Sequence, residues 1–571
     1  MSIAKLGEIL IELYGNDAGA AAFEKLQQIL QKYKDHIPKP RARGVNQRDA
    51  ILITYPDQIQ QVDKHSLAML TEFCERYLTD TISGIHILPF YPWTSDDGFS
   101  VVDYRMVDPR YGDWEDVAKL GHHFRLMFDA VINHISIRSE WFQKMLAGDS
   151  QCRDYFIAPA ETDDLSRVVR PRALPLLTAY QTAEGEKRIW TTFSADQADL
   201  NYANPKVLLE ILDVLLFYAA KGAELIRLDA IAYLWKQSGT SCINLPQTHR
   251  IIQLFRLALD EVAPNVMLIT ETNVPHVDNI SYFGDGTNEA QMVYNFSLPP
   301  LVLHAFQTGS AENLSRWADR LELPSDQVTF FNFLASHDGI GLNPLRGILP
   351  EAEIENIVNH VQSNGGLISY KTDVDGTRRP YELNINYFDA LNDPNADEPL
   401  DLQVDRFVTA HAILFAMKGV PGIYFHSLVG SRGWLAGVQR SGHNRTINRK
   451  KFQWEELIHT ISDPNTREAR VFFRLRHLLK IRERRAAFDP HSLQRVIEYA
   501  PDVFCLLRPS LDGEDHVLCL QNISGDRVSL SNTQLPVEIL PSPRNLINGE
   551  FIEDKGPISM EPYQTLWLAK A

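Results

Sequence analysis

Short runs of consecutive apolar residues recur along the chain, and helix-like segments separate most of them. A run without polar alternation is typical of a strand that is buried on both faces, as in a parallel sheet. The runs cover residues 50–55, 84–90, 125–132, 223–228, 266–270, 291–296, 328–334 and 422–425. Apolar residues at helical spacing predict intervening helices over residues 66–78, 114–121, 205–221, 245–262 and 401–417. This alternation predicts an α/β fold built on a closed (β/α)8 TIM barrel.

Both ends of the chain depart from this alternation. Before residue 48, apolar residues such as Leu6, Ile9 and Leu10 fall at amphipathic helical spacing, and residues 37–43 are typical of a proline-broken basic linker. After about residue 490 the period changes to two, over residues 503–508, 516–521 and 564–568. A period of two predicts a small antiparallel β domain at the C-terminus.

Two connections are too long for plain barrel loops. They follow the third and the seventh predicted strand, so we expect insertions over the face where barrel enzymes place their active site. The predicted units are an N-terminal helical extension (1–47), three barrel segments (48–134, 201–340 and 401–490), two insertions (135–200 and 341–400) and a C-terminal β domain (491–571).

Composition and charge narrow the possible partners. Hydrophobic residues make up 44% and charged residues 23% of the 571 residues, as in ordinary globular proteins. The formal net charge of −17 argues against general nucleic-acid binding, because no basic surplus exists to neutralise phosphates. A few local arginines still suffice to bind a small anion.

Cysteine usage and the apolar segments indicate the compartment. The 5 cysteines are scattered and lack C-x-x-C spacing, which favours a reducing environment and gives no zinc signature. The first residues lack the apolar core of a signal peptide. The most apolar helix-like stretch, residues 207–220, contains Glu210 and Asp213 and is too short to cross a bilayer. We therefore expect a cytoplasmic protein with no membrane partner, and the oligomeric state stays open.

Two of the apolar runs end abruptly in an acid, at Asp229 and at Glu271. Each acid alone is equally well a solvated loop residue. In a barrel, however, the C-terminal strand ends hold the catalytic groups. Neighbouring strands lie about 4.7–4.9 Å apart, and the two carboxyls of a retaining glycosidase lie about 5–5.5 Å apart. Acids at neighbouring strand ends are therefore candidates for a catalytic pair.

The strand ends, taken in order, resemble those of glycoside hydrolase family 13, the α-amylase superfamily. The motifs are Asp129-Ala-Val-Ile-Asn133-His134, Arg227-Leu-Asp229, Glu271 and His337-Asp338. The resemblance implies that Asp229 is the nucleophile and Glu271 the acid/base, with a higher pKa than Asp229. It implies that Arg227 keeps Asp229 ionised. Asp338 would bind the sugar's 2- and 3-hydroxyls beside His134 and His337, although each histidine alone is also explained by packing.

Further stretches are similar to the sucrose phosphorylase group of that family, in which phosphate replaces water as the attacking group. They include Asp96-Asp97-Gly98-Phe99-Ser100, Arg170-Pro-Arg172 and Asn444-Arg445-Thr-Ile-Asn448-Arg449. The resemblance implies that Asp97 and Arg445 hold the glucose 4-hydroxyl and that Phe99 forms an apolar platform. Arg172 and Tyr233 would meet phosphate, because a bidentate arginine suits a phosphate dianion; a surface salt bridge is the alternative for Arg172.

The resemblance extends end to end only for the glucosylglycerate phosphorylases within that group. The N-terminal extension and the stretches at residues 332–338, 343–346, 430–432 and 447–451 support it. It implies reversible phosphorolysis of 2-O-α-glucosylglycerate to α-glucose 1-phosphate and D-glycerate, with phosphate as co-substrate and no cofactor. The acceptor carboxylate needs a cation, for which the candidates are Arg378, Arg379, Arg432 and Arg440.

Alternatives remain at the level of the sequence. Phosphorolysis of sucrose, sucrose 6′-phosphate or glucosylglycerol would use the same carboxylates and differ in the acceptor contacts. A plain α-glucosidase-type hydrolase and an inactive binding subunit are further alternatives. Asn133 lies where many α-amylases bind calcium, but the first insertion lacks a clear carboxylate cluster, so we expect no metal.

Overall fold

The chain forms a closed parallel barrel with two insertions and a C-terminal β domain. The computed structural model describes residues 2–38, 44–172, 174–372, 377–531, 533, 535–553 and 556–570. In spatial order the barrel strands are β1 (Ile51–Thr54), β16 (Val420–Tyr424), β12 (Thr329–Asn332), β11 (Met292–Tyr294), β10 (Met267–Thr270), β9 (Ala223–Leu228), β4 (Arg125–Ala130) and β3 (Gly84–Ile87). The predicted (β/α)8 fold is confirmed, and each strand lies within or beside its predicted run.

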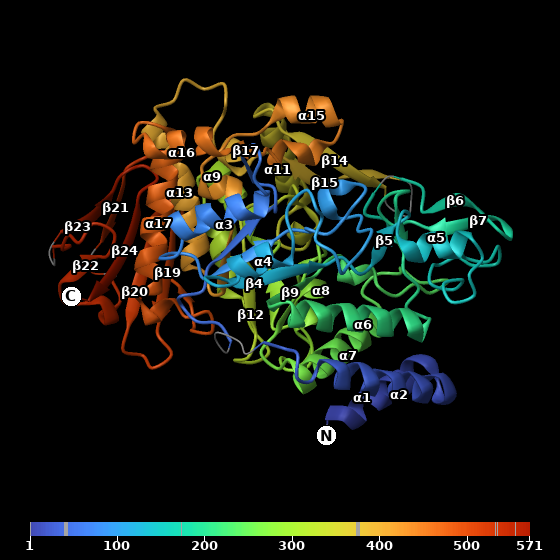
Figure 1. Ribbon diagram of the computed structural model, residues 1–571. Coiled ribbons are helices and arrows are strands. Elements are labelled where there is room, and N and C mark those ends of the chain that lie inside the picture. The colour runs from blue at the N-terminus through green and yellow to red at the C-terminus, as the bar shows by residue number, and fades with distance from the viewer. Residues whose placement is uncertain are drawn as a thin grey trace.

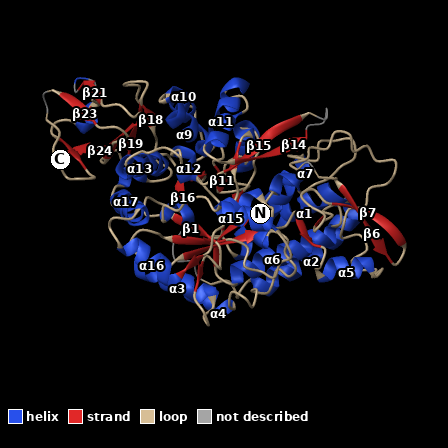
Figure 2. Ribbon diagram, turned by 90° about the horizontal axis from the view of Figure 1, so that it is seen from above, coloured by secondary structure: helices blue, strands red, loops and turns tan. Residues whose placement is uncertain are grey.

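Helices surround the barrel (Figures 1 and 2). Most of their apolar residues are buried. The surrounding helices are α3 (Ser66–Tyr77), α4 (Trp114–Leu120), α6 (Pro205–Ala220), α7 (Pro246–Val262), α8 (His276–Ile280), α9 (Leu298–Thr308), α10 (Glu312–Asp319), α13 (Leu400–Ala416), α14 (Phe425–Leu428), α16 (Trp454–Ser462) and α17 (Arg467–Glu483). Helix α6 begins where Asn204 accepts a hydrogen bond from the Lys206 N–H and Pro205 occupies the first turn.

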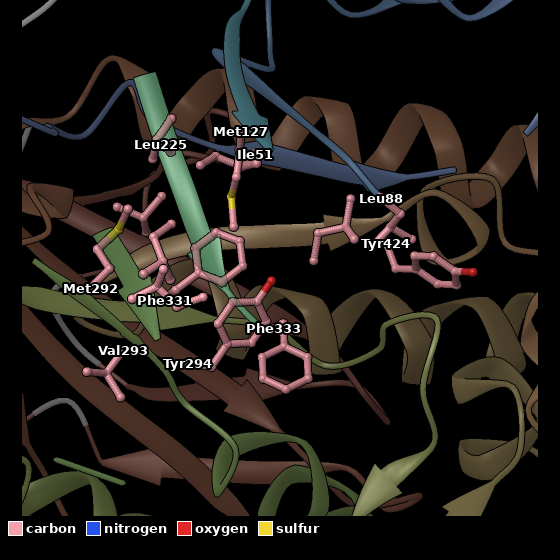
Figure 3. Packing of buried hydrophobic residues seen from close by; sticks show 14 of the residues in the cluster. Ile51, Leu88, Met127, Leu225, Met292, Val293, Tyr294, Phe331, Phe333 and Tyr424 are labelled. Atoms are coloured by element: carbon pink, nitrogen blue, oxygen red, sulfur yellow. The ribbon is translucent and has the colours of Figure 1, made fainter. Parts of the chain in front are cut away.

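The barrel interior is filled by side chains. Figure 3 shows buried residues from different strands, among them Met292, Tyr294 and Phe331. The rings of Tyr294 and Phe331 have centroids 4.7 Å apart. A filled interior leaves the C-terminal ends of the strands as the place for a pocket.

The two insertions differ in architecture. The first contains β5 (His134–Ser136), α5 (Glu140–Leu146), β6 (Leu177–Thr182), β7 (Gly185–Trp190) and β8 (Gln197–Asp199). The second contains β13 (Ile340–Gly341), α11 (Glu351–Ser363), β14 (Leu367–Thr372), β15 (Arg378–Asn384) and α12 (Tyr387–Leu391). Figure 1 shows the β6–β7 hairpin at the right edge of the molecule. The antiparallel β13–β15–β14 sheet brings the second insertion back to the barrel mouth.

The N-terminal extension is a helix pair, α1 (Ser2–Tyr14) and α2 (Asn16–Tyr33), which packs on α7 and α6 (Figure 1). Leu6, Leu10 and Leu26 are buried in this contact. The helices approach so closely that a Cβ on Gly19 would lie 2.7 Å from the Ile11 Cα. Residues 39–43 of the predicted basic linker lie outside the described residues.

The C-terminal β domain contains a five-stranded antiparallel sheet, as the alternating pattern predicted. Its strands, in spatial order, are β18 (Arg495–Val496), β19 (Val503–Pro509), β20 (His516–Asn522), β24 (Thr565–Lys570) and β22 (Pro543–Asn545). A second, two-stranded sheet joins β21 (Val528–Ser531) to β23 (Pro557–Met560). Short strands β2 (Ile59–Gln60) and β17 (Phe452–Gln453) pair beside the barrel. Within the described part of the chain, no helix has the length and apolarity to cross a membrane.

Candidate active site

Asp229 and Glu271 leave the barrel at neighbouring positions. They follow β9 and β10, whose last residues Leu228 and Thr270 are partners in the parallel register. Glu271 Oε2 accepts a hydrogen bond from the backbone N–H of Ala230 at 2.9 Å. Ala230 has a φ of 48°, a left-handed conformation that turns the chain sharply after Asp229. Both carboxylates line a pocket at the C-terminal end of the barrel.

Arg227 lies between the two carboxylates. It is 1% exposed, its Nη1 donates to Asp229 Oδ1 at 2.9 Å, and its Nη2 lies 3.8 Å from Glu271 Oε2. Asp129 also forms an ion pair with Arg227, and His86 lies 2.7 Å from the other oxygen of Asp129. The contact expected between Arg227 and Asp229 is therefore present, and Asp129 fixes the guanidinium from the barrel side.

The expected order of the two pKa values does not follow from this geometry. Burial raises the pKa of Asp229 well above its usual value, and burial also raises the pKa of Glu271. The Arg227 guanidinium opposes the rise at both carboxyls, and the negative charges of Glu271 and Asp338 add to it at Asp229. Because the charge of Arg227 is shared with Asp129 and with Glu271, it does not separate the two carboxyls, and the higher pKa expected for Glu271 stays a prediction.

A third carboxylate, Asp338, lies on the same pocket wall after β12. Arg445 forms an ion pair with it, and Arg449 lies 3.7 Å away. Although burial acts in the opposite direction, these two arginines hold the pKa of Asp338 well below its usual value. Asp338 is therefore an anionic hydrogen-bond acceptor at neutral pH.

His337 and Phe99 form a flat apolar wall. Their rings stack with centroids 4.6 Å apart and an interplanar angle of 5°. Burial lowers the pKa of His337 to about 3, so this imidazole is neutral at physiological pH. Both residues line the pocket, as does His134, whose Nε2 lies 2.8 Å from the carbonyl oxygen of Phe99.

The sequence placed Asp97 in the sugar pocket, but Asp96 lines it instead. The two residues belong to the 3₁₀ turn η1 (Asp96–Gly98), and both have left-handed φ angles, 53° and 48°. The turn directs Asp97 toward Arg449 Nη1 at 2.8 Å and leaves its side chain 39% exposed. The spacing of residues in a motif cannot show which of two adjacent aspartates faces the pocket, because the directions of their side chains depend on the backbone angles of the turn.

Arg449 was absent from the predicted site. It is 4% exposed, and its Nη1 also lies 3.1 Å from Asp96 Oδ1. It therefore links Asp96 with Asp97 and approaches Asp338. The stretch Asn444–Arg449 contains two arginines four residues apart, and the resemblance pointed only to Arg445.

The pocket lining also includes residues from both insertions. Arg172, Phe193 and Gln197 come from the first insertion, and Tyr381 and Glu382 come from β15 in the second. Tyr233, from the 3₁₀ turn η2 (Ile231–Tyr233) after β9, lies beside the ring of Phe193 with centroids 5.6 Å apart. The structure thus brings the two residues predicted to meet phosphate, Arg172 and Tyr233, to one pocket.

Glu382 was not predicted. It is 1% exposed, accepts a hydrogen bond from the Gly339 N–H at 2.6 Å and lies 3.0 Å from Arg445 Nη2. It fixes both the residue after Asp338 and the arginine that pairs with Asp338. No motif surrounds Glu382, so only the sheet register of β13 with β15 reveals it.

The arginines predicted for the acceptor carboxylate lie elsewhere. None of Arg378, Arg379, Arg432 and Arg440 lines the pocket. Arg378 stacks on Tyr370, Arg440 stacks on Trp434, and Arg432 donates to Gln403 at 3.0 Å. The arginines that line the pocket are Arg172 and Arg445. Arg445 is already paired with Asp338 and Glu382, whereas no carboxylate of the described residues forms an ion pair with Arg172.

Asn133, which lies where many α-amylases bind calcium, contacts another side chain of the protein instead. The Lys236 ammonium donates to Asn133 Oδ1 at 2.7 Å. Over the ranges that the structure describes, no group of three or more histidine, cysteine, aspartate or glutamate side chains is arranged to hold a metal ion.

The sequence matches known proteins of one family. The family model described as "Alpha amylase, catalytic domain" matches residues 75–339. The chain is 45% identical to the glucosylglycerate phosphorylase of Spirochaeta thermophila, over 99% of this chain and 98% of that protein. It is also 45% identical to the glucosylglycerate phosphorylase of Escherichia coli, over 99% of both chains.

A solved structure agrees at the level of the fold. The crystal structure of sucrose 6F-phosphate phosphorylase from Thermoanaerobacter thermosaccharolyticum superposes with a TM-score of 0.72 at 25% identity. The superposition covers 84% of this chain and 94% of that chain.

Proposed function

The chain belongs to the glucosylglycerate phosphorylases of glycoside hydrolase family 13, the α-amylase superfamily, and on that basis we propose that it is a retaining glucoside phosphorylase. The reaction is the reversible phosphorolysis of 2-O-α-glucosylglycerate to α-glucose 1-phosphate and D-glycerate. The substrates are thus a small glucoside and inorganic phosphate, with no organic cofactor. Similarity over nearly the whole chain supports the choice of acceptor.

One observation in the structure supports a phosphorylase in particular. Two largely buried carboxylates lie at neighbouring strand ends, and Arg172, a guanidinium without a carboxylate partner among the described residues, lines the same pocket. The carboxylates suit glycosidic bond cleavage. The guanidinium suits an anion, either a phosphate or the carboxylate of glycerate.

In the first displacement, Asp229 attacks C1 of the glucosyl group. Arg227 donates to Asp229 Oδ1, so Oδ2 is the oxygen left to form the bond to C1. Glu271 donates its proton to the glycosidic oxygen, and glycerate leaves. The raised pKa of Glu271 favours the protonated carboxyl that this step needs.

In the second displacement, a phosphate oxygen attacks C1 of the glucosyl-enzyme. Glu271 takes up the phosphate proton, the bond from C1 to Asp229 breaks, and α-glucose 1-phosphate forms with net retention. Arg172 and Tyr233 are the groups we assign to phosphate, and Arg172 is also the group we assign to the glycerate carboxylate.

The closed end of the pocket is the proposed glucose site. Asp338 accepts hydrogen bonds from the 2- and 3-hydroxyls, and the stacked Phe99 and His337 provide the apolar wall. Asp96 and Arg445 supply further polar groups of this pocket, and Arg449 pairs with Asp96. A cytoplasmic location is part of the same proposal, and it is supported by the cysteines Cys74, Cys152, Cys242, Cys505 and Cys519, all of which are free thiols.

A donor panel tests the proposal. Glucose 1-phosphate release is measured with and without phosphate from glucosylglycerate, sucrose, sucrose 6′-phosphate and glucosylglycerol. We expect phosphate-dependent release, fastest from glucosylglycerate. Rapid release from sucrose with none from glucosylglycerate would overturn the acceptor. Free glucose formed at one rate with or without phosphate would identify a hydrolase, and no turnover of any donor would favour a binding subunit.

A further inference from the structure

The loop that carries Asp96 and Phe99 into the pocket has an unusual backbone. The three residues of turn η1, which are Asp96, Asp97 and Gly98, have positive φ angles of 53°, 48° and 112°. Such angles are uncommon for residues other than glycine, and they persist where the surrounding structure holds them. Because Asp96 and Phe99 line the pocket, the shape of the proposed glucose site depends on what holds this turn.

Asp196, from the first insertion, contacts both ends of this loop. Its Oδ2 accepts hydrogen bonds from the hydroxyl of Thr94, at 2.5 Å, and from the hydroxyl of Ser95, and these two residues directly precede the turn. Its carbonyl oxygen accepts a third hydrogen bond, of 3.0 Å, from the hydroxyl of Ser100, which follows Phe99. Hydrogen bonds to a charged acceptor are stronger than those between neutral groups. One residue thus joins the insertion to the chain on either side of the turn.

The loop is closed on itself, so a contact at its ends acts on its middle. The Thr94 N–H donates to the Ser100 carbonyl at 3.1 Å, and Trp93 and Val101 form an isolated β-bridge just outside this pair. The Ser136 hydroxyl, from β5 of the first insertion, lies 2.6 Å from that of Thr94. Since only five residues lie between the closed ends, a shift at Thr94 changes the backbone angles of the turn itself.

Two other side chains hold the loop, and both do so within it. Arg449 pairs with the two aspartates of the turn, and Gln197 donates from its Nε2 to the Phe99 carbonyl at 2.8 Å. Asp196 instead acts at the ends of the loop. No basic side chain in the part of the chain that the structure describes forms an ion pair with Asp196, so its carboxylate has the two hydroxyls as its side-chain partners.

We propose that Asp196 is a positioning residue of the proposed glucose site. Its carboxylate fixes turn η1 from the first insertion and thereby holds Asp96 and Phe99 in place for the sugar. Asp196 does not line the pocket, so it acts on the sugar only through the turn. The assignment rests on the proposed function, because the ligand of this site is a glucosyl group.

The first test removes the carboxylate and measures sugar binding. The probe is 1-deoxynojirimycin, an imino sugar with the ring shape and hydroxyls of glucose, titrated by calorimetry. Asp196→Ala should weaken its binding and lower kcat/KM for glucosylglycerate, each by about 10- to 100-fold, the loss expected for hydrogen bonds to a charged acceptor. Asp196→Asn keeps an oxygen acceptor and should lose less than Asp196→Ala in both measurements.

Asp163→Ala is the matched control for these variants. Asp163 is an exposed aspartate of the same insertion, and it accepts a hydrogen bond from the Ala160 N–H within its own turn. Its replacement should leave the affinity for the imino sugar at the wild-type value. A purely structural aspartate at position 196 would lower the melting temperature without changing this affinity at a temperature where the variant is folded.

The second test asks whether the two hydroxyls transmit the effect. Thr94→Val/Ser95→Ala removes both donors and leaves Asp196 in place, and it should weaken the imino sugar to a similar extent. Adding Asp196→Ala to this double variant should then cause little further loss, because residues that act through one contact are not additive. Independent effects would multiply instead.

Each outcome bears on the proposal. Unchanged affinity of Asp196→Ala for the imino sugar overturns it, as do losses that multiply in the triple variant. If Asp196→Ala does not fold, Thr94→Val/Ser95→Ala decides by its own affinity. If the wild-type protein binds the imino sugar but turns over none of the four donors, the proposed function fails, and the affinities still decide whether Asp196 positions the site. A wild-type protein that binds no imino sugar overturns the positioning role, because no glucose site then exists.

Discussion

Asp229 and Glu271 differ in their hydrogen-bond partners although they lie side by side. Asp229 accepts a charged hydrogen bond from Arg227 at 2.9 Å, whereas Glu271 accepts a neutral one from the backbone of Ala230. A guanidinium contact stabilises the anion that a nucleophile must be, and a backbone amide does so more weakly. The roles of Asp229 as nucleophile and Glu271 as acid/base are therefore supported by their positions and their hydrogen-bond partners, and not by pKa shifts in opposite directions.

Replacing Glu271 by Gln should remove activity on the natural donor but leave the nucleophile in place. A donor with a good leaving group, together with azide as a nucleophile, should recover part of the rate, because neither step then needs proton transfer. Asp229→Asn is the comparison, and we expect no recovery for it with any donor. Burst and steady-state kinetics with an activated glucosyl donor measure both variants. Substantial turnover by Asp229→Asn would refute its role as nucleophile.

The adjacent aspartates of turn η1 provide a second test at this scale. Asp96 lines the pocket, and Asp97 is turned toward Arg449 and is 39% exposed. Asp96→Asn should lower kcat/KM by about 10- to 100-fold, because a polar group left without its partner in the pocket loses about 1–3 kcal/mol. Asp97→Asn should lower it by less than about tenfold. If steady-state kinetics show a larger loss for Asp97→Asn than for Asp96→Asn, Asp97 is the residue that contacts the sugar.

Arg172 is the third residue to test. Arg172→Ala should raise KM for phosphate more than KM for the glucoside in the phosphorolysis direction. In the reverse direction it should weaken the binding of glycerate. Arg170→Ala is the matched control, since Arg170 does not line the pocket and its Nη1 lies 3.5 Å from the Leu174 carbonyl. Equal changes in both KM values, or equal effects of the two variants, would leave Arg172 with a structural role only.

Among the elements, helix α17 has a structural arginine that joins the barrel to its surroundings. Arg482 is 1% exposed and donates to backbone carbonyls. The acceptors are Gln47, Asp49, Phe415, Gly419 and Phe488. A fixed fork of five N–H donors is what such a site needs, and only arginine offers it.

Arg482→Lys should therefore destabilise the protein although the charge is kept. A lysine has three donors, so at least two buried carbonyls lose their partner, at about 1–3 kcal/mol each. We expect a lower urea midpoint for Arg482→Lys, followed by circular dichroism, and no change for Arg484→Lys, because Arg484 is exposed on the same helix end. Equal midpoints for the two variants would contradict this account of Arg482.

At the scale of the whole molecule, acid should weaken the fold before most carboxylates titrate. Burial lowers the pKa of His337 and His426 to about 3 and that of His411 to about 4. The unfolded chain takes up these protons near pH 6.5, but the folded chain does not. Stability is therefore lost as the pH falls below about 6.5, by about 1.4 kcal/mol per pH unit for each histidine.

His411 isolates this effect from the active site, where the raised pKa values of Asp229 and Glu271 act in the opposite direction. Its Nδ1 lies 2.9 Å from the Phe407 carbonyl, far in sequence from the pocket residues. His411→Gln should reduce the loss in unfolding free energy between pH 7 and pH 5 by about 2 kcal/mol. Urea unfolding at both pH values measures it, with the exposed His122→Gln as control. An unchanged pH dependence in His411→Gln would contradict the assigned pKa.

The barrel could be predicted from the sequence because the signals for its strands are local. Eight apolar runs give eight strands, and Asp229 and Glu271 follow two of them directly, so their position at the barrel mouth needs no long-range information. The choice of Asp97 over Asp96 failed because it depends on two left-handed backbone angles. The four arginines predicted for the acceptor carboxylate do not line the pocket, since charge at a loop position does not reveal which side the side chain faces.

By itself, then, the sequence determined the fold class, the order of the strands and the strand-end carboxylates, because periodicity and chain order fix them. Only the tertiary structure decided what surrounds those carboxylates. Glu382 reaches the pocket through the register of an antiparallel sheet. Arg449 pairs with Asp96 and Asp97, which belong to a distant turn. Such contacts depend on side-chain direction and on desolvation, which exist only once distant parts of the chain have packed together.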